Sequence, residues 1–223
     1  MLVLHWAPDN ASLIVRLALE ELGLPWRAVL VDRRAEAQKS AAYLALNPQG
    51  LIPVLETPHG PIWETAAILL WLSEQTGRML PPPGDAERGA GLKWLFFLSN
   101  TLHADLKMQF HPARHATDPA AVQAPTRARL QGHFRLLDDL AGQGWRWFGA
   151  EAPSMLDCYV AVAMRWAALY TAGAPRWFFA EDYPALQALA RRLEARPAAL
   201  AAALAEGLGP RPFADPQPVR RLP

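Results

Sequence analysis

The clearest chemical signal in the sequence lies in two short motifs between residues 47 and 76. Pro53 stands at the start of the apolar run Val54-Leu55, and because proline has no N–H for a sheet ladder, a strand must begin at or just after it. A cis bond before Pro53 would expose the backbone N–H and C=O of Ile52 to an extended ligand, which would pair with them as an added strand does. Ile52 and Pro53 are therefore predicted to bind a small peptide.

The second motif is Glu64-Thr65, which precedes a run of apolar residues at helical spacing that ends at Gly77. Thr65 is thus expected at a helix N-terminus, where unpaired N–H groups and the helix dipole favour a carboxylate. The Glu64 side chain favours an amino group beside it, so the pair matches the free head of an α-amino acid. The ordinary alternative for both motifs is a turn before a strand and a capped helix, without a ligand.

The elements that must position these motifs alternate between strand and helix over residues 2–76. Their order, βαβ followed by αββα, is the thioredoxin-like arrangement, and we predict an α/β domain over residues 1–80. The periodicity and the turn residues predict strands at Leu2 to His5 and Trp26 to Val31, helices at Ser12 to Leu22 and Arg33 to Leu46, a hairpin of Val54-Leu55 with Ile62-Trp63, and the helix from Thr65.

The rest of the chain is predicted to be helical. The proline-rich stretch at residues 81–88 is predicted to be a linker, and an all-α domain is predicted over residues 89–206. The proline- and arginine-rich tail 207–223 is expected to be loose or laid over the surface. The predicted helices run from Ala86 to Phe110, Ala121 to Leu140, Ser154 to Tyr170, Tyr183 to Ala195, and on to Glu206.

The order and spacing of these motifs resemble the glutathione transferase family over roughly residues 1–205. In the helical half the likeness is closest to the bacterial beta class. The motifs that carry it are Asn47-Pro-x-Gly-x-x-Pro53-Val-Leu, the His59-Gly60 turn, Glu64-Thr65-x-x-Ile-Leu, Leu102-His103, Ser154-x-x-Asp157 and Arg165-Trp166-Ala167.

This resemblance implies how the ligand, glutathione, is held. In the family the proline is cis, the residue before it pairs with the cysteinyl backbone, and the Glu-Thr pair binds the γ-glutamyl end. Carried over, these roles fall to Ile52, Pro53, Glu64 and Thr65. Arg34 or Lys39, or Arg33 beside them, is expected to meet the glycine carboxylate, although a solvated basic face explains these residues equally well. The resemblance also implies a homodimer.

The residue that activates the glutathione thiol is the open question. A thiol of pKa about 8.5 is mostly protonated at pH 7, so a hydrogen-bond donor at the sulfur raises the thiolate fraction. The family places this donor in the loop after the first strand. Where the beta class has Pro-Gly-Ala-Cys-Ser, this chain has Pro8-Asp9-Asn10-Ala11-Ser12, so Ala11 replaces the cysteine, and Trp6 stands near the position of the tyrosine used by other classes. Ser12 and Asn10 are the candidate donors. Their alternatives are a helix cap and a turn residue.

His103 is the third catalytic candidate, because it resembles the beta-class histidine near the substrate pocket. We expect Trp6, His103 and Trp166 to line that pocket. The alternative for His103 is a satisfied core or surface residue on a long amphipathic helix, and the tryptophans are mostly expected in the core.

Composition and charge exclude several other classes of function. The 223 residues are 52% hydrophobic and 19% charged with a formal net charge of +1, which is typical of a globular protein and gives no basic footprint for nucleic acid. The N-terminus loses its apolar run at His5, so no signal peptide is predicted, and no apolar stretch reaches the roughly 18 residues of a membrane span. We therefore expect a cytoplasmic protein without membrane partners.

Two further sequence features argue against a metal site and against a disulfide within the protein. Cys158 is the single cysteine, which excludes an intrachain disulfide and a Cys-x-x-Cys centre. His111 and His115 have the spacing of a metal pair, but Pro112 lies between them and no carboxylate completes a zinc motif. No metal is predicted.

The predicted function is attack of the glutathione thiolate on an electrophilic, apolar second substrate. Within enzymes, the alternative is a glutathione-dependent isomerase, lyase or disulfide reductase. A further alternative is a glutathione-binding scaffold protein that has lost catalysis, since both the tyrosine and the cysteine are absent.

Overall fold

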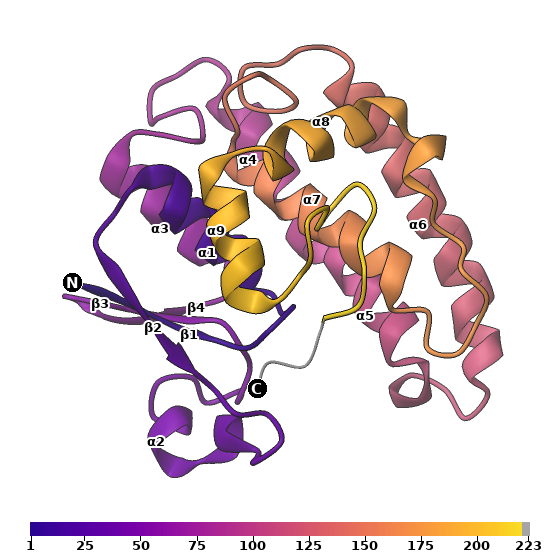
Figure 1. Cartoon of the computed structure of the whole chain (residues 1–223), viewed down its shortest axis with the longest axis horizontal. Coiled ribbons are helices and arrows are strands. Elements are labelled where there is room, and N and C mark those ends of the chain that lie inside the picture. Colours follow the sequence, from indigo (N-terminus) through magenta and orange to yellow (C-terminus); the bar gives the residue numbers. More distant parts are fainter. Residues whose placement is uncertain (220–223) are drawn as a thin grey trace.

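The first half of the chain forms a mixed four-stranded sheet (Figure 1). The structure is a computed structural model that describes residues 1–219. The strands lie in the order β2-β1-β3-β4; β1 pairs with β2 in parallel and with β3 in antiparallel, and β3 and β4 form an antiparallel hairpin. Their bounds are Leu2–Trp6 for β1, Trp26–Leu30 for β2, Val54–Thr57 for β3 and Gly60–Trp63 for β4.

Two helices pack against each other and against this sheet. Helix α1 spans Ser12–Leu22 and α3 spans Thr65–Thr76, and both contribute their apolar residues to the main core. Gly23 and Gly77 each adopt a φ of +65° directly after a helix, a left-handed conformation that costs glycine little. The predicted helix ends and the predicted hairpin are confirmed.

The predicted helix from Arg33 to Leu46 is wrong in extent. Only a 3-10 turn, η1 at Ala37–Lys39, and the short helix α2 at Ala41–Leu44 form. The Asp32 carboxylate accepts hydrogen bonds from the backbone N–H groups of residues 34 and 35, and Glu36 adopts a φ of +52°. Side-chain capping of a turn competes with helix formation, so the helix begins only after Ser40.

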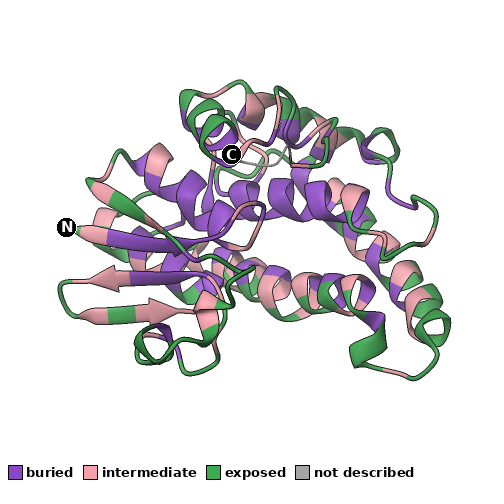
Figure 2. Cartoon of the chain, turned by 60° about the horizontal axis from the view of Figure 1, so that its bottom comes forward, coloured by how far each residue is buried: buried purple, intermediate pink, exposed green. Residues whose placement is uncertain are grey.

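The second half of the chain is helical, as predicted. Its helices surround α7, which is buried along nearly its whole length and packs on α1, and buried residues run through the middle of the molecule (Figure 2). The helices are α4 (Arg88–Phe97), α5 (His103–Phe110), α6 (Pro119–Ala141), α7 (Met155–Leu169), α8 (Pro184–Glu194) and α9 (Pro197–Glu206), with 3-10 turns η3 at Pro112–Arg114 and η4 at Ala180–Asp182.

The start of α7 is fixed by the capping box that the sequence predicts. The Ser154 hydroxyl accepts hydrogen bonds from the backbone N–H groups of Leu156 and Asp157 at 3.1 Å each, and the Asp157 carboxylate accepts one from the Ser154 N–H at 2.7 Å. These bonds satisfy N–H groups that a helix end leaves unpaired.

One turn into the helix, Cys158 is fully buried, and burial raises the pKa of its thiol. Cys158 is therefore an inert core thiol.

The predicted helix from Ala86 to Phe110 forms as one continuous helical run over residues 88–110, with a π-helical turn inside it. This turn, η2 at Leu98–Leu102, separates α4 from α5. Such turns insert an extra residue into a helix and are frequent at functional sites. Ser99 and Asn100, within the turn, line the cavity described below.

The tail is not loose over residues 207–219. It has no helix or strand, yet Leu208 and Phe213 are each only 1% exposed. The Arg165 guanidinium on α7 donates hydrogen bonds to the carbonyls of Pro212 at 3.2 Å and Gln217 at 3.0 Å. This part of the tail is thus anchored in the core, and the rest of the predicted loose tail, residues 220–223, lies outside the described residues.

The structure confirms the predicted fold class, an α/β thioredoxin-like half followed by an all-α half. Over residues 1–219, none of the helices is both long and apolar enough to cross a membrane.

Candidate functional site

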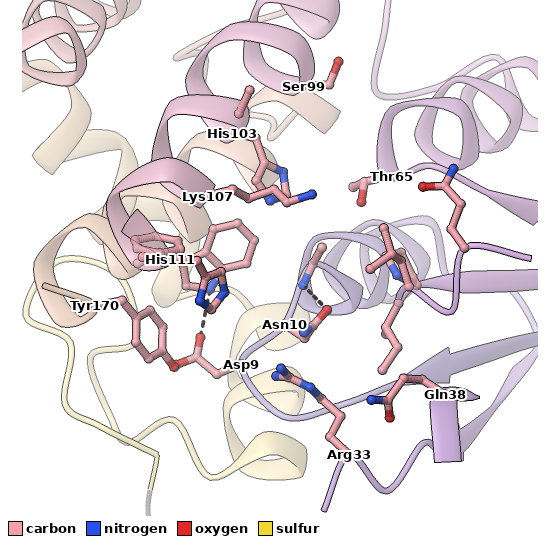
Figure 3. A pocket seen from close by; sticks show the side chains of 18 of the residues that line it. Asp9, Asn10, Arg33, Gln38, Thr65, Ser99, His103, Lys107, His111 and Tyr170 are labelled. Carbon is pink, nitrogen blue, oxygen red and sulfur yellow. Dashed lines mark hydrogen bonds between the residues drawn. The ribbon is translucent and has the colours of Figure 1, made fainter. Parts of the chain in front are cut away.

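A cavity of about 980 Å³ lies between the two halves of the chain. One wall comes from the loops after β1 and before β3 and from the start of α3. The other comes from η2, α5, η3 and the end of α7 (Figure 3). Of the predicted site residues, those that line the cavity are Asn10, Lys39, Ile52, Pro53, Glu64, Thr65, His103 and Trp166.

The Ile52–Pro53 segment lies at the cavity with the cis peptide bond that the sequence suggests. Tyr43 and Asn47 fix the chain just before it, since the Tyr43 hydroxyl and the Asn47 side-chain amide each donate a hydrogen bond to the Leu51 carbonyl at 2.8 Å. Within residues 1–219, the N–H and C=O of Ile52 have no hydrogen-bond partner in the protein. Both groups are available to an extended ligand.

Glu64 and Thr65 form the second binding element. Thr65 opens α3, as predicted, and is buried at the cavity wall beside Ala66. Glu64 adopts a φ of +71°, which costs a non-glycine residue about 1–3 kcal/mol and recurs at ligand sites. Its side chain does not cap the helix, so the first N–H groups of α3 and the Glu64 carboxylate both stay open to a ligand.

Asn10 presents a free donor to the cavity. Its side-chain oxygen accepts a hydrogen bond from the Ala11 N–H at 2.8 Å, which fixes the orientation of the amide (Figure 3). Among residues 1–219, its Nδ2 has no hydrogen-bond partner, and Asn10 is only partly buried. An oriented N–H donor of this kind is what a thiolate requires.

Ser12, the other candidate donor, lies outside the cavity. It is fully buried, and its hydroxyl accepts a hydrogen bond from the Ala7 N–H at 3.2 Å and donates one to the Ala7 carbonyl at 3.1 Å. The hydroxyl therefore closes the loop after β1 and has no proton left for a thiolate. Its position argues against the predicted catalytic role.

Trp6 and Arg34 also lie outside the cavity lining, contrary to their predicted places. Trp6 is 9% exposed and packs beneath the guanidinium of Arg16, 4.5 Å from its ring centroid. Arg34 is on the exposed turn capped by Asp32, while its neighbour Arg33 lines the cavity. Lys39 lines the cavity, is exposed, and pairs with Glu36.

Asp9 anchors the loop that carries Asn10, a role that the sequence did not reveal. Its carboxylate accepts two hydrogen bonds of 2.9 Å from Arg165, one of 3.1 Å from Trp166 and one of 2.5 Å from Tyr170. The Asp9 N–H donates to Glu206 on α9 at 2.9 Å. Asp9 thus fastens the loop to α7, α9 and the residue after α7.

A signal for Asp9 exists in the sequence. It stands where the beta-class pattern has glycine, and it adopts a φ of +50°. Aspartate is one of the few residues that tolerate this left-handed conformation. An Asp in place of a loop glycine therefore preserves the turn while adding a charge that needs a partner.

His103 and Trp166 lie together in the helical wall, as predicted for a substrate pocket. The His103 Nδ1 forms a hydrogen bond with the Tyr159 hydroxyl at 2.8 Å, and its ring centroid is 5.1 Å from that of Trp166. Burial, with a smaller contribution from the charge of Lys107, lowers the pKa of His103 to about 4. His103 is therefore neutral at pH 7. Phe110 and Tyr170 extend this aromatic wall.

Among the described residues, no group of three histidine, cysteine, aspartate or glutamate side chains comes together as a metal site would require.

Comparison with known proteins identifies the family. Residues 11–75 match the model of the glutathione S-transferase N-terminal domain, and residues 119–192 match that of the C-terminal domain. Glutathione S-transferase GST-4.5 of Xanthomonas campestris is 30% identical over 212 residues, which cover 92% of this chain and 98% of that relative. The chain belongs to the glutathione S-transferase family.

Two further proteins match this chain over nearly their whole lengths. Disulfide-bond oxidoreductase YfcG of Escherichia coli is 30% identical over 220 residues, covering 94% of this chain and 97% of YfcG. The solved structure of a sphingomonad glutathione S-transferase complexed with glutathione is 31% identical with a TM-score of 0.78, covering 93% of this chain and all of that one. The predicted family and fold are confirmed.

Proposed function

We propose that this protein binds glutathione in the cavity and conjugates its thiolate to an electrophilic substrate. The α-carboxylate of the γ-glutamyl group lies at the N-terminus of α3 by Thr65, and its amino group lies by Glu64. The cysteinyl backbone pairs with Ile52. The glycine carboxylate lies towards Lys39 and Arg33. This order directs the sulfur to the loop after β1.

The observation that carries the reaction is the free Nδ2 of Asn10. Because the Ala11 N–H holds the side-chain oxygen of Asn10, the amide orientation is fixed before glutathione binds, and Nδ2 donates to the sulfur. A hydrogen bond to a charged acceptor stabilises it by about 1.5–3 kcal/mol, and each 1.4 kcal/mol or so lowers the thiol pKa by one unit. The thiolate then attacks an electrophile that rests on the aromatic wall of His103 and Trp166.

The test is the ultraviolet absorbance of the glutathione thiolate in the complex as a function of pH. In the unmodified protein, the pKa of the bound thiol is expected at least about one unit below the free value of about 8.5. Asn10→Ala should raise it by about one unit with little change in affinity, since a neutral thiol makes no strong hydrogen bond. Ser12→Ala is the matched control and should leave it unchanged. An unaltered pKa in Asn10→Ala contradicts the assignment.

A second candidate is reduction of small disulfides. It is favoured by the 30% identity to the oxidoreductase YfcG and by the absence of cysteine from the cavity lining, which leaves glutathione as the thiol. One glutathione thiolate attacks the disulfide and expels a thiolate; a second glutathione attacks the mixed disulfide, yielding oxidised glutathione and two thiols in all. Turnover of 2-hydroxyethyl disulfide, with none of aryl chlorides, would favour this function.

Binding of glutathione with an unshifted thiol pKa and no turnover in either assay would indicate the non-catalytic alternative. A cytoplasmic location and a homodimeric state stay predictions, the latter tested by analytical ultracentrifugation.

A further inference from the structure

The helical wall of the cavity carries a stripe of basic residues that glutathione binding does not use. Lys107 on α5, His111 after it and Arg114 in η3 all line the cavity, and all are exposed. Lys107 is on α5, His111 is the residue directly after that helix, and Arg114 follows in η3, so the stripe runs on from the end of α5 along the same cavity wall. Figure 3 shows Lys107 and His111 directed into the same space as Asn10.

These basic side chains have no acidic partners among residues 1–219. Lys107 and Arg114 take part in none of the ion pairs there. Elsewhere, by contrast, Arg88 pairs with Glu74 at 2.9 Å and Arg129 with Asp105 at 2.8 Å. The whole chain has a net charge of only +1. The stripe is therefore a local excess of positive charge, since the protein as a whole is not basic.

The two acidic residues of the cavity do not offset the stripe. Asp9 is neutralised by Arg165, which donates two hydrogen bonds of 2.9 Å to its carboxylate. Glu64 is assigned to the amino group of glutathione. The ligand does not supply the missing charge either, since its two carboxylates are placed at the α3 N-terminus and near Lys39 and Arg33.

The side chain of His111 reports the positive potential at this wall. The largest cause of its lowered pKa is the partial loss of solvent around the ring at the cavity wall, and the charges of Arg114, Arg33 and Lys107 and the neighbouring His115 lower the pKa further. At pH 7 His111 is therefore neutral and able to donate a hydrogen bond, while Lys107 and Arg114 carry charge. An anion placed among these three side chains meets two charges and one neutral donor.

We propose that the second substrate is an anion: an electrophile with an apolar, preferably aromatic, body and a carboxylate group. The body rests on His103, Phe110 and Trp166, beside the sulfur, and the carboxylate lies among Lys107, His111 and Arg114. Arg114 holds a carboxylate with two parallel hydrogen bonds where Lys107 acts as a point charge. This inference rests on the proposed conjugation reaction and names the class of its substrate.

A matched pair of electrophiles tests the charge alone: 4-chloro-3-nitrobenzoate and its methyl ester. In each, the glutathione sulfur forms a bond to the ring carbon that carries chlorine, and chloride leaves with the bonding electron pair. Because the ester activates the ring more strongly, kcat/KM is divided by the uncatalysed rate constant of each compound. We expect the unmodified protein to favour the carboxylate by at least about tenfold, equivalent to about 1.4 kcal/mol.

Lys107→Gln with Arg114→Gln should remove this preference, measured as the ratio of the two normalised kcat/KM values. The matched control is Lys93→Gln with Arg191→Gln, which makes the same change in charge at exposed positions outside the cavity. This control should keep the preference. Equal use of the two compounds by the unmodified protein, or a preference that survives the Lys107 and Arg114 changes, overturns the inference.

Calorimetry with the two conjugates, S-(4-carboxy-2-nitrophenyl)glutathione and its methyl ester, separates this inference from the proposed reaction. Tighter binding of the carboxylate conjugate that depends on Lys107 and Arg114 supports the inference even if neither electrophile is turned over, in which case only the reaction fails. Turnover of both electrophiles with equal binding of both conjugates retains the reaction and refutes the anionic substrate.

Discussion

Replacing Asp9 by Asn is expected to destabilise the fold and disturb the thiol loop together. Asp9 is 8% exposed and Arg165 is fully buried, so the substitution leaves a buried guanidinium without its counter-charge. The amide oxygen of the new side chain and the carbonyls of Pro212 and Gln217 could still accept hydrogen bonds from it, but none of these acceptors carries a charge. Breaking a buried pair by changing one partner costs about 3–5 kcal/mol, which is a large part of the 5–15 kcal/mol that stabilises a typical domain.

Urea unfolding of a double-mutant cycle measures this cost. Asp9→Asn and Arg165→Met are each expected to lower the free energy of unfolding by about 3–5 kcal/mol. The double variant should lose clearly less than the sum, because either substitution alone already removes the attraction between the two charges. The control is Asp85→Asn, which opens the pair between Asp85 and the exposed Arg146. Solvent screens an exposed pair of this kind, so its loss should cost far less than the loss of the buried pair.

The same cycle has a functional readout. Because Asp9 precedes Asn10 and holds the loop, the thiol pKa of bound glutathione in the Asp9→Asn variant should move towards the value of free glutathione. Thiolate absorbance measures this pKa under conditions where the variant is folded. Additive losses of stability, or a cost no larger than that of Asp85→Asn, would refute the reasoning that this buried pair fixes the loop. An unaltered thiol pKa would refute its link to Asn10.

Three more predictions concern the other parts of the site and fold. Glu64→Ala should weaken glutathione binding at least about tenfold in calorimetry, since a hydrogen bond to a charged group contributes about 1.5–3 kcal/mol; unchanged affinity would contradict the γ-glutamyl assignment. The pKa of His103 is about 4 in the fold and about 6.5 when unfolded, so stability is fully present above pH 6.5 and is lost as the pH falls towards 4. The loss is about 3 kcal/mol. His103→Asn should flatten that part of the stability profile in urea unfolding, and an identical profile would contradict the lowered pKa. Phe213→Ala should cost about 3–5 kcal/mol, as for a core phenylalanine; a loss below 1 kcal/mol would mean that the tail is not part of the core.

The elements that the sequence predicts well are those marked by local signals. Helices α1 and α3 end at glycines, β3 begins after a proline, and α7 starts at a capping box, so each boundary follows from the residues beside it. The placement of Ile52, Pro53, Glu64 and Thr65 at one cavity follows from the spacing of those same signals. Their ligand roles stay predictions.

The elements that the sequence does not predict depend on distant contacts. The π-helical turn at Leu98–Leu102 interrupts a continuous apolar period that favours an unbroken helix. Leu208 and Phe213 are isolated apolar residues in a proline-rich tail, and no periodicity marks them as core. Lys107, His111 and Arg114 follow His103 at intervals of four, four and three residues, but only the fold shows that all of them line one cavity.

The choice between Ser12 and Asn10 shows why local reasoning leaves the thiol donor open. Both are polar residues of one loop, and each has an ordinary structural role that explains its presence. In the fold, Ser12 closes the loop on Ala7, while Asp9 holds a φ of +50° and Asn10 lines the cavity. Arg165, which is 156 residues away in the sequence, holds the carboxylate of Asp9. A buried ion pair between the two halves of the chain therefore helps to decide which of the two side chains faces the cavity, and no pattern within the loop contains that information.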